Sequence, residues 1–93
     1  MTSAAPMDYG LWLDTCPDGK VTLKGWTDTG AGRTDHWPPY TLCTRADLPA
    51  RLAELGLVLA AGHDLTDLDE QWDVYVHHEN PAQLRAHLDV AAA

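Results

Sequence analysis

Phenylalanine and isoleucine are absent from this 93-residue sequence, and lysine, cysteine and asparagine are scarce. The two cysteines, Cys16 and Cys43, are too few for a disulfide scaffold and lack the CxxC spacing of a zinc or redox motif. We expect both to be reduced, although their places in two predicted strands leave a bridge between them open. No apolar run approaches the ~20 residues that a membrane-spanning helix requires.

The start of the chain has no basic residue and no apolar stretch, so we expect no secretory signal and a cytoplasmic protein. Residues 1–7 are expected to form a flexible tail and residues 8–93 a single domain, because this length suits one modest hydrophobic core. Apolar residues make up 45% and charged residues 22% of the chain, values that are typical of a folded globular domain. The scarcity of Phe, Ile, Lys and Asn is typical of a GC-rich bacterial or phage genome.

Negative charge is concentrated in the second half of the chain. The formal net charge is −8, and residues 47–93 carry nine acidic residues against two arginines, a net of −7. Direct binding to nucleic acid requires a cationic surface that displaces counterions, so this balance argues against it. An acidic surface suits a basic protein partner instead.

A β-hairpin is predicted over residues 9–27. Pro17 and Gly19 favour a type I turn followed by a left-handed glycine, which would pair Cys16 with Lys20. The register that follows gathers an apolar set on the inner face of the hairpin: Tyr9, Leu11, Leu13, Val21 and Leu23.

The same register predicts an aromatic patch on the other face of the hairpin. It places Trp12 opposite Lys24 and Gly10 opposite Trp26, so Trp12, Lys24 and Trp26 share one side. Exposed aromatic side chains of this kind are common anchors of protein interfaces. We therefore expect a partner protein or a second copy of the chain to cover Trp12 and Trp26.

Two helices are predicted from their end signals. Asp47 as N-cap, Pro49 in the first turn and Gly56 after the last turn bound the first helix. Asn80 as N-cap and Pro81 at the first helical position begin the second. Leucines at helical spacing would face the core: Leu48, Leu52 and Leu55 in the first helix, Leu84 and Leu88 in the second.

Three further strands are predicted. Residues 40–43 would form a short edge strand, residues 57–61 a buried strand, and residues 72–78 a strand with alternating burial. The alternation places three side chains on the inner face: Trp72, Val74 and Val76. Residues 28–38 are expected to be a loop, and residues 62–71 an acidic connection with room for one helical turn.

The element order β-β-(β)-α-β-β-α predicts an α+β fold of two layers. The first layer would be an antiparallel or mixed sheet of four to five strands, and the second would be two helices packed on one face of that sheet.

A row of carboxylates runs through the acidic connection and into the strand that follows it: Asp64, Asp67, Asp69, Glu70 and Asp73. These residues lack the DxDxDG pattern of a calcium loop, and the five histidines show neither HxH nor HxxxH spacing. We therefore predict no metal and no cofactor. One interpretation of the row is an ordinary solvated loop. The more specific interpretation is a surface that faces a basic protein.

No motif indicates a reaction, so the sequence favours a non-enzymatic protein-binding domain. Inhibitors, immunity proteins and phage counter-defence proteins are often of this kind, and here the acidic face would occupy the nucleic-acid-binding surface of a basic partner. Two alternatives stay open. One is a homodimerising assembly subunit that uses the aromatic patch, and the other is a small enzyme or ligand-binding module built on four residues: His36, Cys43, His63 and His77.

Overall fold

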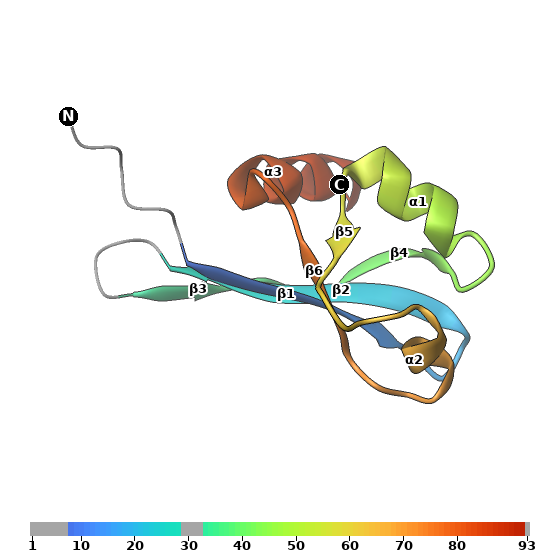
Figure 1. Cartoon of the computed structure of the whole chain (residues 1–93). Coiled ribbons are helices and arrows are strands. Elements are labelled where there is room, and N and C mark those ends of the chain that lie inside the picture. The colour runs from blue at the N-terminus through green and yellow to red at the C-terminus, as the bar shows by residue number, and fades with distance from the viewer. Residues whose placement is uncertain (1–7, 29–32, 93) are drawn as a thin grey trace.

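The computed structural model describes residues 8–28 and 33–92, so the predicted tail at residues 1–7 lies outside the described residues (Figure 1). It has the predicted α+β fold. The elements follow one another in this order: β1 (Tyr9–Thr15), β2 (Lys20–Asp28), β3 (Thr34–His36), β4 (Tyr40–Thr44), α1 (Leu48–Leu55), β5 (Val58–Leu59), α2 (Thr66–Asp69), β6 (Val74–His77) and α3 (Pro81–Ala92).

All the strands belong to one antiparallel sheet with the order β3-β2-β1-β6-β5, and β4 also pairs with β2. Strands β3 and β4 therefore share one edge of β2, β3 along its end and β4 along its beginning. Between them, the Trp37 N–H donates to the carbonyl oxygen of Gly25 at 2.9 Å. The prediction of a loop over residues 28–38 was thus wrong for Thr34–His36, because this polar segment pairs with the end of β2.

The hairpin of β1 and β2 has the predicted register, with Trp12 opposite Lys24 and Gly10 opposite Trp26. Its turn is also as predicted. The Gly19 N–H donates to the Cys16 carbonyl at 2.9 Å, and Gly19 has a φ of 84° that few other residues adopt without strain.

Helices α1 and α3 lie over the same face of the sheet, whereas the short α2 lies on the other side of the sheet near its end (Figure 1). Leucines of α1 and α3 pack with the inner-face residues of β1, β2 and β6, and together they make most of the core. The sheet contributes Leu11, Leu13, Val21, Leu23, Val74 and Val76, and the two helices contribute Leu48, Leu52, Leu55, Leu84 and Leu88. Each fully buried leucine or valine contributes about 1.5–3 kcal/mol of transfer free energy, so the packing between the sheet and the two helices holds the layers together.

Helix α1 begins and ends at the predicted residues, and α3 begins at the predicted one. Gly56 ends α1 in the left-handed conformation, with φ 71° and ψ 25°. The Leu57 N–H then donates to the Leu52 carbonyl at 2.9 Å. At the start of α3, the Asn80 side-chain oxygen accepts a hydrogen bond from the Gln83 N–H at 3.2 Å, as an N-cap does.

Edge strand β3 is tied to α3 through charged and aromatic contacts. Arg85 of α3 forms an ion pair with Asp35 of β3. The guanidinium carbon of Arg85 also lies 5.8 Å from the centre of the Trp37 ring, which is only 6% exposed. The Tyr40 hydroxyl donates to Asp89 of the same helix, which fixes the beginning of β4 as well.

Two burial predictions were wrong. Trp72 was expected in the core, but it is 66% exposed and precedes β6, which begins only at Val74. The run at residues 57–61 was expected to be a buried strand, but β5 is two residues long and lies at the sheet edge, where Val58 is 64% exposed. Within the described residues, no helix is long and apolar enough to span a membrane.

Candidate protein-binding surface

The sheet face turned away from α1 and α3, here called the outer face, carries the predicted aromatic patch. Alternation along the strands places Trp12 of β1, Lys24 and Trp26 of β2, and Tyr75 of β6 on this face. Trp12 and Trp26 are half-buried, and Tyr75 is 49% exposed. Neither long helix covers these side chains, because α1 and α3 lie on the other face (Figure 1).

Trp12 and Tyr75 form the centre of the outer face. They are directly opposite each other in the β1–β6 pair, and their ring centres are 6.2 Å apart at an angle of 55°. His63 packs against the other side of Tyr75, with ring centres 5.4 Å apart and nearly perpendicular rings. The Tyr75 N–H also points to the His63 Nδ1 at 3.4 Å. These contacts hold the Tyr75 ring in place while much of it stays accessible.

Lys24 lies beside Trp12 and is held by a carboxylate. Its Nζ donates to Oδ2 of Asp14 at 2.8 Å. This hydrogen bond and the charge of Asp14 raise the pKa of Lys24, and the more distant charge of Asp73 raises it further. Lys24 therefore stays protonated, and Asp14 already has a cationic partner within the chain.

The Trp26 side chain lies over Gly10 of the neighbouring strand. A Cβ added to Gly10 would approach Nε1 of Trp26 to 2.5 Å, so the indole occupies the space that a side chain would need. His36 of β3 is directly opposite Trp26 and is exposed. The aromatic strip of the outer face therefore crosses three adjacent strands, from Trp26 on β2 through Trp12 on β1 to Tyr75 on β6.

The link between β5 and β6 covers residues 60–73, two residues more at each end than predicted, and the name acidic connection is used for all of it below. Three of the five predicted acidic residues hold this link in shape. Asp64 accepts a hydrogen bond from the Thr66 N–H at 3.2 Å, and Asp67 accepts one from the Asp64 N–H at 3.2 Å. Asp69 accepts two hydrogen bonds from Arg45, at 2.9 and 3.3 Å. These carboxylates thus shape the start of α2 and tie it to the turn after β4.

Glu70 and Asp73 are exposed near the end of the acidic connection, on either side of Trp72. Gln71 has a φ of 66°, and the Trp72 N–H donates to the Asp67 carbonyl at 3.0 Å, so the chain turns sharply before β6. Asp73 influences Lys24, and His63 of the same connection touches Tyr75. The acidic connection therefore borders the outer face at His63 and Asp73.

The four residues of the enzyme alternative are spread over the molecule. His36 and His77 belong to β3 and β6, with β2 and β1 between them in the sheet. His63 packs on Tyr75. Cys43 packs against the core, where burial raises the pKa of its thiol and so lowers its reactivity. In the described part of the chain, no three His, Cys, Asp or Glu side chains converge on a metal position.

The two thiols are free and face opposite sides of the sheet. The Cys16 Sγ lies 3.0 Å from the hydroxyl of Thr22, on the outer face, whereas Cys43 is paired with the core residue Val21. A bridge between the two cysteines would therefore have to pass through the sheet.

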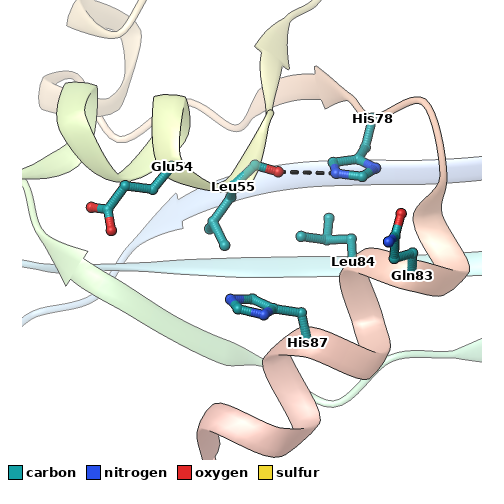
Figure 2. Close-up of a pocket in the computed structure, with 6 residues that line it drawn as sticks. All are labelled: Glu54, Leu55, His78, Gln83, Leu84 and His87. Atoms are coloured by element: carbon teal, nitrogen blue, oxygen red, sulfur yellow. Dashed lines mark hydrogen bonds between the residues drawn. The ribbon is translucent and has the colours of Figure 1, made fainter.

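A small pocket lies between the end of α1 and the first turns of α3, as Figure 2 shows. Its cavity of ≈ 180 Å³ is lined by Glu54, Leu55, His78, Gln83, Leu84 and His87. The Asn80 N–H donates to the His78 Nδ1, which leaves Nε2 protonated to donate to the Leu55 carbonyl, both at 2.9 Å. His78 thus joins the two helices as a structural group, and the cavity is smaller than the roughly 300 Å³ at which ligand pockets usually begin.

Sequence reasoning missed Tyr75 and His63 as parts of the binding surface. The alternation of residues 72–78 already placed Tyr75 on the outer side, but no local signal relates His63 to a strand twelve residues later. Comparison with known protein families, with curated proteins and with solved structures finds no match for this chain.

Proposed function

We propose that this chain is a small non-enzymatic domain that binds a basic surface of another protein, such as the nucleic-acid-binding surface that an inhibitor or counter-defence protein would occupy. The observation that carries the proposal is the aromatic strip of the outer face, which neither α1 nor α3 covers and which borders the acidic connection. Aromatic side chains supply most of the binding free energy in many interfaces, and flanking charge selects the partner.

The charge of the chain supports a basic partner. The sequence has 14 acidic residues and six basic ones, so most carboxylates have no cation available within the chain. Lys24 on the outer face is already paired with Asp14, which leaves the acidic connection to set the sign of the neighbouring surface. A basic surface would gain from this field, and the gain would fall as salt rises.

The role of the acidic connection in binding can be tested with two double variants of equal net charge. Glu70→Gln with Asp73→Asn removes two exposed charges at the end of the acidic connection, and Glu54→Gln with Glu79→Gln removes two charges outside it. Immobilised wild type should capture basic nucleic-acid-binding proteins from a bacterial lysate at about 0.1 M salt and lose them near 1 M, where the Debye length falls to about 3 Å. The first variant should capture much less at low salt, and the second should match wild type.

The role of the aromatic strip is tested with a partner protein purified from that capture experiment. Tyr75→Ser should weaken its binding by about tenfold or more, because truncating an interface aromatic costs roughly 2 kcal/mol. Val90→Ser is the matched control, since Val90 is 77% exposed on α3. Equal binding by all four variants, or capture that does not depend on salt, would contradict the proposal.

A further inference from the structure

The partner's binding element can be inferred from the shape of the outer face. The face of a sheet offers no backbone groups, because the N–H and C=O groups of a strand point toward its neighbours within the sheet, as those of β1 do toward β2 and β6. A segment that lies on this face must therefore satisfy its own backbone hydrogen bonds. A helix does so, whereas an extended peptide would need a sheet edge.

The aromatic strip also has the length of a helical stripe. From Trp26 to Tyr75 it crosses two strand spacings, about 10 Å, and shifts by two residues along the strands, about 7 Å, so it is about 12 Å long. Residues i and i+7 or i+8 of a helix lie about 10.5–12 Å apart on one face, with i+3 and i+4 between them. Three apolar side chains of one helix would thus meet Trp26, Trp12 and Tyr75.

We propose that the outer face docks an amphipathic helix whose polar side is rich in lysine and arginine, an inference that rests on the proposed function. The apolar side of this helix packs on the aromatic strip. Its basic side faces the exposed carboxylates Glu70 and Asp73 of the acidic connection, which borders the strip through the His63–Tyr75 contact. A second copy of the chain is a poorer occupant, because each copy carries a net charge of −8.

A designed peptide tests this inference without the natural partner. The probe is an 18-residue peptide, roughly five helical turns, of leucine and lysine with leucine at positions i, i+3, i+4 and i+7. A scrambled peptide of the same composition has the same charge but no apolar stripe. We expect the patterned peptide to quench the fluorescence of the outer-face tryptophans and to gain helical circular dichroism on mixing, and the scrambled peptide to bind about tenfold more weakly or worse.

Four variants then locate the peptide. Tyr75→Ser and the Glu70→Gln/Asp73→Asn double variant should each weaken binding of the patterned peptide by about tenfold. Val90→Ser and the Glu54→Gln/Glu79→Gln double variant should leave the affinity unchanged. Folding of every variant is checked by urea denaturation, so that a loss of binding cannot be mistaken for a loss of structure.

Three results would overturn the helix inference. The scrambled peptide could bind as well as the patterned one, or the patterned peptide could bind without becoming helical. The chain alone could also form a dimer in sedimentation that Tyr75→Ser dissolves, which would make a second copy the occupant. If the peptide fails while a natural basic partner still depends on Tyr75 and Glu70, only the helix inference fails. If that partner's binding is indifferent to both residues, the proposed function fails as well.

Discussion

The four tryptophans occupy three different environments. Trp37 is 6% exposed beneath Arg85, Trp12 and Trp26 are half-buried on the outer face, and Trp72 is 66% exposed next to β6. The same residue type therefore serves the core at one position and an accessible surface at others. The cost of truncating each side chain should follow its environment.

We expect Trp37→Ala to lower the free energy of unfolding by roughly 3–5 kcal/mol, because it leaves a cavity between β4 and α3. Trp72→Ala should change it by only about 0.5 kcal/mol, since most of that ring is already in water. Urea denaturation followed by circular dichroism measures both changes. Equal destabilisation by the two substitutions would show that Trp72 is buried in solution.

Cys43 should react slowly with alkylating reagents. Burial and the nearby charge of Asp47 raise the pKa of its thiol, and Arg51 only partly opposes them. Because the thiolate is the reactive form, its fraction at neutral pH is lower than that of an ordinary cysteine. In a Cys16→Ser background, the rate of reaction with iodoacetamide should rise with pH through a midpoint above that of a short cysteine peptide. A midpoint at or below the peptide's value would contradict this.

Among the elements, the two sharp ends of α1 and α2 use different residues for the same left-handed conformation. Gly56 follows α1 with a φ of 71°, and Gln71 follows α2 with a φ of 66°. A residue with a Cβ pays about 1 kcal/mol or more in this region, whereas glycine does not. Opposite substitutions should therefore have opposite effects.

Gly56→Ala should lower the free energy of unfolding by about 1 kcal/mol, and Gln71→Gly should raise it by about 0.5–1 kcal/mol. Space is not the cause at Gly56, because an added Cβ would meet only the His78 ring, with Nε2 at 3.6 Å and Cδ2 at 3.9 Å, both ordinary contacts. Thermal and urea unfolding of both variants check the signs. Destabilisation by Gln71→Gly would mean that the Gln71 side chain makes a contact that outweighs its backbone strain.

Most elements could be predicted from the sequence because residues close together in the chain determine them. Pro17 and Gly19 determine the turn, and the turn determines the register that places Trp12 and Trp26 on the outer face. Asn80 caps α3 through a contact three residues away.

The wrong predictions concern residues whose burial and pairing depend on contacts with distant parts of the chain. The alternation over residues 72–78 predicts that the strand begins at Trp72. Instead, the chain turns at Gln71, and the Trp72 N–H donates to the Asp67 carbonyl rather than to a neighbouring strand. Val58 looked like a core residue, yet it lies on an edge strand with no neighbour beyond it in the strand order. The meeting of the acidic connection with Tyr75 depends on how β5 and β6 pair, which no short-range pattern encodes.

At the scale of the whole molecule, charge should act in opposite directions on binding and on folding. Ion pairs in the described part of the chain include Lys24–Asp14, Arg45–Asp69, Arg51–Glu54 and Arg85–Asp35. Each is partly exposed, and such pairs contribute only about 0–1 kcal/mol. Self-repulsion within a chain of net charge −8 is the larger effect on folding, and it opposes the compact state.

We therefore expect the midpoint of thermal unfolding to rise as sodium chloride increases from about 0.02 to 0.3 M, because the Debye length falls from roughly 20 to 6 Å and screens this repulsion. Over the same range, binding to a basic partner should weaken. The Glu70→Gln/Asp73→Asn variant should unfold at a higher temperature than wild type in low salt, and its midpoint should depend less on salt. Differential scanning calorimetry measures both. A midpoint that falls with salt would show that the ion pairs outweigh the repulsion. The charges of Glu70 and Asp73 would then not destabilise the fold, contrary to what we expect of carboxylates kept for binding.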